Sequence, residues 1–156
     1  CRFKKVKENY ILNNSLKIIK KDIVFEKNYW KISAAHDGYN KIYNATHERE
    51  IEFYPEQFKF IGTDKILNKK LNLNFKFDIR FHLEPDVKLM KTQDNSAILI
   101  EIGDEGWKFT CSNFDINIDN GLYFGNRNSY TQNQNIFISG ITNNQNENII
   151  WQLSKI

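Results

Sequence analysis

The chain has 156 residues, a net charge of +3 and 40% hydrophobic residues. A domain of this length buries about 70% of its unfolded surface, so we expect a core that needs neither a disulfide nor a metal. No apolar run approaches the roughly 20 residues of a membrane span, and no signal peptide is visible, so we expect no membrane partner. Because the first residue is Cys1 and CRFKKVKENY reads as an interior segment, we expect a C-terminal piece of a longer protein.

Basic residues gather near the start of the chain. Such a cluster can attract a polyanion, or it can be a solvated strand edge on which lysines prevent sheet aggregation. We favour the second interpretation and expect no nucleic-acid partner, because neither an aromatic RNA-binding run nor zinc-finger spacing is present. The residues concerned are Arg2, Lys4, Lys5, Lys7, Lys17, Lys20 and Lys21.

Short strand-like segments follow in chain order: SLKIIKKDIVFE has two short apolar stretches split by charges, YWKISAA alternates apolar with polar residues, and QFKFIG is a short partner for the segment before it. The alternation in EREIEFYPE places Ile51 and Phe53 on one face and the glutamates on the other, and Pro55 ends the segment. The expected strands of this half of the chain lie within residues 15–26, 29–35, 48–56 and 57–62.

The longest alternation runs from Leu71 to Leu83, with apolar residues at every odd position. A period of two over this length predicts a strand with one buried and one solvated face, and it fits no helix. We expect the odd face to form the core of one sheet. NKKLNLN, at the start of the run, has the composition to open with a helical turn.

Three further pairs of strands are expected after residue 83. SAILIEI and WKFTC flank the loop GDEG, FDINI and LYFG flank DNG, and IFISGI and IIWQLSKI flank TNNQNEN. Asn120-Gly121 is the strongest two-residue hairpin signal in the chain. Strands recurring about every ten residues between polar turns predict an all-β fold, an antiparallel β-sandwich.

The three histidines, His36, His47 and His82, are the candidates for a site. Histidines from distant strands can bind zinc, but these spacings match no local metal motif, and we expect no metal site within the chain. Acid–base work is open to His36 beside Tyr39 and Tyr43. HDGYNKIY also fits a hydrogen-bonded turn whose tyrosines cover the core, and we favour this structural role.

Four segments together resemble the C-terminal β-sandwich region of heparinase II/III-like polysaccharide lyases. They are AAHDGYNKIYNATHEREIEF, RFHLEPDVK, GLYFGN with TQNQNIFISG, and IIWQLSKI, and the resemblance covers Lys31 to Trp151. Two positions depart from the family pattern. Glu48 stands where a basic residue is expected, and Glu84 stands where a second histidine often occurs.

The resemblance implies a bacterial, periplasmic or secreted lyase in which an N-terminal α/α-toroid precedes the sandwich. Such enzymes cleave acidic polysaccharides, glycosaminoglycans among them, by β-elimination at uronic acids. The toroid supplies a catalytic Tyr and Asn, while a catalytic His and the ligands of a structural divalent metal (zinc or similar) precede this segment. We therefore expect residues 1–156 to form one sandwich domain, or part of one, that is inactive alone, holds no cofactor and supports the toroid. The candidates for facing the polysaccharide are His36, Tyr39, His47, Arg49, Arg80 and His82.

A stand-alone carbohydrate-binding or scaffold sandwich is the second hypothesis. Its support is a solvated strand face with aromatic side chains available to stack on sugars. The residues concerned are Asn72, Asn74, Lys76, Arg80 and His82, with Trp30, Tyr39 and Trp107 as the aromatic platform.

Overall fold

The computed structural model describes residues 2–6, 9–13, 16–68, 74–125, 129–143 and 146–156. Within these ranges nearly every element is a strand, and all strand pairs are antiparallel. The all-β prediction is confirmed. The elements are β1 Arg2–Val6, β2 Asn9–Asn13, β3 Ile18–Glu26, β4 Tyr29–His36, α1 Asn40–Tyr43, β5 Ala45–Tyr54, the 3-10 turn η1 Pro55–Gln57, β6 Lys59–Asn68, β7 Lys76–His82, β8 Lys88–Lys91, β9 Ala97–Ile102, β10 Glu105–Cys111, β11 Ile116–Tyr123, β12 Thr131–Ile141 and β13 Glu147–Lys155.

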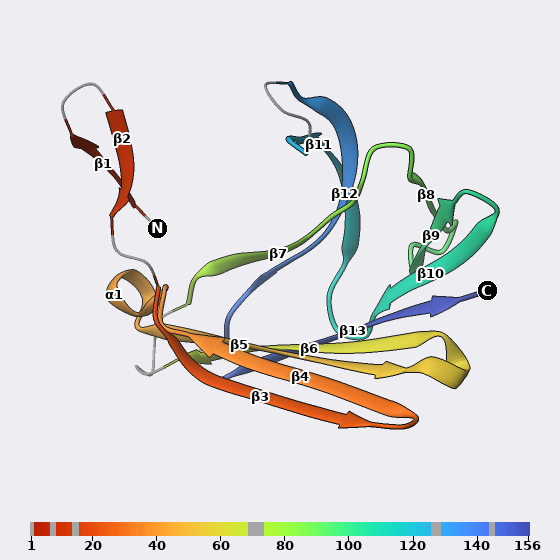
Figure 1. Ribbon diagram of the computed structural model, residues 1–156, viewed down its shortest axis with the longest axis horizontal. Coiled ribbons are helices and arrows are strands. Elements are labelled where there is room, and N and C mark those ends of the chain that lie inside the picture. Colours follow the sequence, from red (N-terminus) through yellow and green to blue (C-terminus); the bar gives the residue numbers. More distant parts are fainter. Residues whose placement is uncertain (1, 7–8, 14–15, 69–73, 126–128, 144–145) are drawn as a thin grey trace.

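Two sheets of unequal width form the sandwich (Figure 1). The wide sheet has eight strands in the order β3-β4-β5-β6-β13-β10-β9-β8, and the narrow sheet has three in the order β11-β12-β7. The hairpin β1–β2 forms a separate two-stranded sheet. Because three strands face eight, the narrow sheet cannot cover the whole inner face of the wide one.

The core lies between β7, β12 and β11 on one side and the middle of the wide sheet on the other. The ring of Phe81 on β7 packs edge-on against Phe109 and Trp151, with centroids 4.9 and 4.8 Å away. The alternation of β7 is as expected, since Phe77, Ile79 and Phe81 are less exposed than their polar neighbours. The first residues of the predicted strand, 71–73, lie outside the described residues, as does most of the segment in which a helical turn was anticipated.

The predicted hairpin at Asn120-Gly121 is wrong. β11 runs straight through both residues, and Gly121 pairs with Asn133 of β12. A Cβ on Gly121 would collide with the side chains of Asn133 and Asn135. The glycine therefore leaves room for the amide groups of Asn133 and Asn135 against β11. A glycine that makes room in a strand has the same sequence signature as a glycine in a turn.

Other expected turns are present. Gly103 has a φ of 58° in the tight loop between β9 and β10, as the GDEG signal predicted. Pro55 ends β5 by opening the 3-10 turn. Within the described residues, no helix is long and apolar enough to cross a membrane.

Candidate functional site

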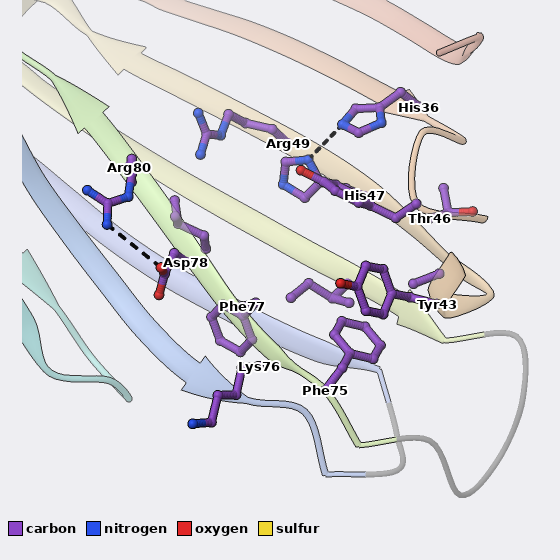
Figure 2. Close-up of a pocket in the computed structure, with 14 residues that line it drawn as sticks. His36, Tyr43, Thr46, His47, Arg49, Phe75, Lys76, Phe77, Asp78 and Arg80 are labelled. Carbon is purple, nitrogen blue, oxygen red and sulfur yellow. Dashed lines mark hydrogen bonds and ion pairs between the residues drawn. The ribbon is translucent and has the colours of Figure 1, made fainter. Parts of the chain in front are cut away.

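A cavity of about 400 Å³ opens beside β7, where the narrow sheet stops short of β4 and β5 (Figure 2). Residues 75–80 of β7 form one wall. His36, His47 and Arg49 line the opposite side. The loop and short helix that follow β4 close one end with two tyrosines, of which Tyr43 packs on Phe75 at 5.0 Å between ring centroids.

Asp64 anchors the polar side chains of this region from beneath the cavity. Its side chain is fully buried on β6. One carboxylate oxygen accepts from His47 Nε2 and Arg49 Nε, each at 2.7 Å. The other accepts from Arg49 Nη2 at 3.1 Å and from the indole Nε1 of Trp151 at 2.8 Å. Four donors on one buried carboxylate make it a satisfied structural anion.

The position of Trp151 depends on a glycine. Gly62 lies opposite Trp151 in the register of β6 and β13. A Cβ at this position would lie only 2.0 Å from two carbon atoms of the indole ring. Gly62 thus lets the ring lie flat over β6, and this places its N–H against Asp64.

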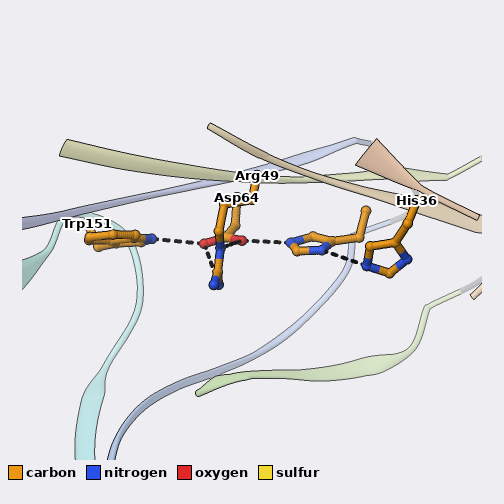
Figure 3. Close-up of polar contacts among 5 residues, drawn as sticks. His36, Arg49, Asp64 and Trp151 are labelled. Carbon is orange, nitrogen blue, oxygen red and sulfur yellow. Dashed lines mark hydrogen bonds and ion pairs between the residues drawn. The ribbon is translucent and has the colours of Figure 1, made fainter. Parts of the chain in front are cut away.

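The two histidines continue the network in one direction (Figure 3). The backbone N–H of Gly38 donates to His36 Nδ1 at 3.2 Å, so this nitrogen is an acceptor. His36 Nε2 must then carry the proton, and it donates to His47 Nδ1 at 3.2 Å. His47 in turn donates from Nε2 to Asp64. Both rings are neutral in this arrangement, and every ring nitrogen has a partner.

The surroundings shift the pKa of two of these groups, His36 and Asp64. Burial lowers the pKa of His36, the adjacent His47 lowers it further, and Asp37 opposes both effects. Burial alone would raise the pKa of Asp64. The hydrogen bonds from His47 and Arg49, the charge of Arg49 and the hydrogen bond from Trp151 outweigh that effect and hold the pKa of Asp64 below its ordinary value.

The cavity brings together five of the six predicted site residues. His36, His47 and Arg49 stand on paired strands, and Tyr39 is half exposed, with its ring 5.4 Å from that of His36. Arg80 lines the wall, but its guanidinium turns to the outer face of the narrow sheet, where it donates to Asp119 at 3.0 Å.

The sixth residue, His82, lies apart. Its side chain is exposed on the outer face of β7 and does not line the cavity. The long alternating strand therefore contributes its edge to the site, and its histidine does not.

The chain's own residues do not fit the divalent metal that the resemblance implies. Within the described ranges, no group of three or more His, Cys, Asp or Glu side chains could hold a metal ion. The nitrogens of His36 and His47 already have partners within the chain.

Sequence reasoning missed Asp64 and Trp151, on which the site depends. One signal was available for the first. Phe60, Gly62, Asp64 and Ile66 alternate along one face of β6, and a carboxylate in such an apolar row requires buried donors. The partners themselves come from β5 and β13, far apart in sequence, and no spacing pattern connects them.

Comparisons with known proteins give a consistent picture. The family model described as heparinase II/III-like, C-terminal, matches residues 5–152. No curated protein matches the sequence.

The fold of this chain is similar to part of two solved protein structures. The heparan sulfate lyase HepC from Pedobacter heparinus superposes with a TM-score of 0.74 at 11% identity, covering 90% of this chain and 21% of that one. A heparinase III gene product superposes with a TM-score of 0.67 at 12% identity, covering 90% and 22%. The chain thus spans about a fifth of the length of these solved proteins.

Proposed function

Since the chain belongs to the heparinase II/III-like, C-terminal family, we propose that it is the C-terminal β-sandwich portion of a polysaccharide lyase and is inactive alone. The family match over residues 5–152 carries this proposal. In the complete protein the sandwich supports an N-terminal α/α-toroid, and the substrate is an acidic polysaccharide containing uronic acid. Heparan sulfate is the first candidate, because it is the substrate named for the similar HepC structure.

The histidine network supports the inactivity of the isolated chain. A general base needs a nitrogen lone pair that faces the substrate. His47 Nδ1 accepts from His36, and His36 Nδ1 accepts from Gly38. The two rings therefore serve as positioning groups that hold the Asp64–Arg49 pair, and proton abstraction falls to another part of the lyase.

The test compares the 156-residue chain with the complete gene product on heparan sulfate. Lyase action creates an unsaturated uronate, which is followed by its ultraviolet absorbance. We expect product from the complete protein and none from the isolated chain. Turnover by the isolated chain would contradict the proposal, and so would the absence of turnover by the complete protein on heparin, heparan sulfate and alginate alike.

Contact of the six candidate residues with the polysaccharide remains a prediction, and Tyr39 offers the cleanest test. Its ring is 50% exposed at the end of the cavity, and its described hydrogen bonds are made by the backbone carbonyl, which the substitution keeps. In the complete protein we expect Tyr39→Ala to raise KM by about three- to tenfold through lost stacking. Tyr130→Ala removes a ring of similar exposure (63%) elsewhere and serves as the control.

A stand-alone carbohydrate-binding domain is the second candidate. The observation in its favour is an exposed stacked pair of rings, Phe25 and Trp30, with centroids 5.0 Å apart. Binding of neutral and acidic oligosaccharides to the isolated chain, read from the heat of titration, distinguishes the two. Saturable binding that Trp30→Ala abolishes would favour the binding domain.

Two further proposals, on a structural metal and on cellular location, rest on the resemblance to the family. A structural divalent metal would be held by residues outside this chain, and the location would be periplasmic or secreted. Elemental analysis of the complete protein and fractionation of the producing cells test these two expectations.

A further inference from the structure

One wall of the cavity is the edge of a strand. All six residues from Phe75 to Arg80 line it. Successive side chains of a strand point to opposite faces, so a cavity lying against one face would meet only every second residue. The cavity therefore runs along β7 on the side away from β12, as Figure 2 shows for the labelled residues.

The hydrogen-bonding pattern shows which backbone groups face the cavity. Thr142 N–H donates to the carbonyl of Phe75 at 3.0 Å, which marks Phe75 as bonded toward β12. In an antiparallel pair this role alternates, so Phe77 and Ile79 also bond toward β12. The N–H and C=O groups of Asp78 and Arg80 point to the opposite edge. Among the described strands, β7 pairs with β12 alone.

The floor beyond this edge is an uncovered apolar surface. Phe25 is 73% exposed, Ile23 56%, Ile32 55% and Trp30 40%. Ile23 pairs with Ile32 and Phe25 pairs with Trp30, so the four share one face of β3 and β4. His36 lies on that face too, because it follows Ile32 by four residues. The surface is thus the inner face of the wide sheet, left open by the narrow one.

A row of rings joins this surface to the core. Trp30 contacts Phe53 at 5.1 Å, Phe53 stacks on Phe60 at 4.3 Å, and Phe60 approaches Trp107 at 6.4 Å between centroids. Contiguous exposed apolar surface of this kind marks an interaction site. Here it continues the packing of the core without interruption.

We propose that the free edge of β7 accepts one further β-strand, supplied by the polypeptide outside these 156 residues. The added strand would widen the narrow sheet and cover the apolar floor. The side chains of the added strand that point toward the wide sheet would be apolar where they contact Ile23 and Ile32 and polar where they contact His36. Main-chain bonding to an open edge, with side chains entering the floor beneath, is an established mode of strand addition.

The source of the strand follows from the size of the relatives. The superposition covers 90% of this chain but only 21% of HepC, so HepC carries several hundred residues beyond the matched sandwich. Continuity of the floor with the core favours a strand of the same protein over a second copy or a sugar. The inference rests on the proposed function only in taking the chain as one part of a larger lyase.

Hydrogen exchange of individual β7 amides tests the proposal. In the isolated chain, the amides of Phe77 and Ile79 should exchange slowly and those of Asp78 and Arg80 rapidly. In the complete protein, the amides of Asp78 and Arg80 should slow by at least about tenfold, because each becomes hydrogen-bonded. Unchanged exchange at these two amides in the complete protein would overturn the proposal.

A proline variant keeps the test independent of side chains. Asp78→Pro removes an N–H that faces the open edge, a place where sheets tolerate proline, so the isolated chain should match Asp78→Ala in its urea midpoint. In the complete protein, Asp78→Pro should restore rapid exchange at Arg80, whereas Asp78→Ala should leave it slow. Equal protection of Arg80 in both variants would contradict strand addition.

Two other occupants give distinct results. Protection of Asp78 and Arg80 in the isolated chain that grows with protein concentration would assign the edge to a second copy. Protection that appears only on adding heparan sulfate oligosaccharide would assign it to sugar. Either result overturns the proposal. If the complete protein is an active lyase but the amides of Asp78 and Arg80 are not protected, the added strand is refuted and the proposed function stands. If these amides are protected but the complete protein has no lyase activity, the added strand stands and the proposed function is refuted.

Discussion

The network around Asp64 makes the sharpest prediction about stability. Asp64→Asn preserves the size of the side chain but replaces one acceptor oxygen with an NH₂ group. Each carboxylate oxygen receives two N–H donors. In either orientation of the asparagine amide, its NH₂ group would therefore point at two N–H groups and could accept a hydrogen bond from neither. Arg49 also loses its counter-charge while about two-thirds of its side chain stays buried.

The expected cost is about 3–5 kcal/mol, the range for removing one partner of a buried ion pair. Domains of this size unfold at roughly 5–15 kcal/mol, so the variant should lose a large share of its stability. Urea unfolding followed by tryptophan fluorescence measures the change directly, because Trp151 donates to the altered group. The midpoint should fall with little change in the slope of free energy against urea.

Asp119→Asn is the matched control. Asp119 also accepts from an arginine, Arg80 Nη1 at 3.0 Å, but its side chain is 47% exposed. Its loss should cost less than about 1 kcal/mol, as for surface ion pairs. If Asp64→Asn costs no more than the control, the four-donor network does not stabilise the fold, and the reasoning fails.

Two further predictions concern the same region. Gly62→Ala should destabilise the isolated chain by about 1–3 kcal/mol, because the added methyl displaces the Trp151 indole from β6; Gly106→Ala, whose methyl meets only the end of a flexible isoleucine, should cost clearly less, and equal midpoints in urea would refute the argument. The pKa of His36 lies below its ordinary value of 6.5, so protonation favours the unfolded chain. The contribution of neutral His36 to the free energy of unfolding is complete above pH 6.5 and is lost as the pH falls through the lowered pKa of His36 in the folded chain. His36→Gln should therefore flatten the decline in stability below pH 6.5, and identical slopes for variant and wild type would show that His36 does not contribute.

The sequence was sufficient wherever the answer depends on period and composition. The alternation in residues 74–83 requires a strand with one buried face, and β7 has one. The GDEG loop needs a residue with positive φ, and Gly103 supplies it. The antiparallel sandwich and the family resemblance follow from many such local signals, each set by side-chain direction and backbone sterics over a few residues.

The tertiary structure decided the rest, because it depends on which distant strands become neighbours. Asn120-Gly121 has the signature of a turn, yet the side chains across from it on β12 make it the middle of a strand. Asp64 and Trp151 are 87 residues apart, and only the pairing of β6 with β13 brings them to 2.8 Å. His82 shares the outer face of β7 with Arg80, but the cavity runs only along residues 75–80, so the histidine two residues further on does not line it. What β7 contributes is its unpaired edge, and an edge exists only once the order of strands in the sheet is known.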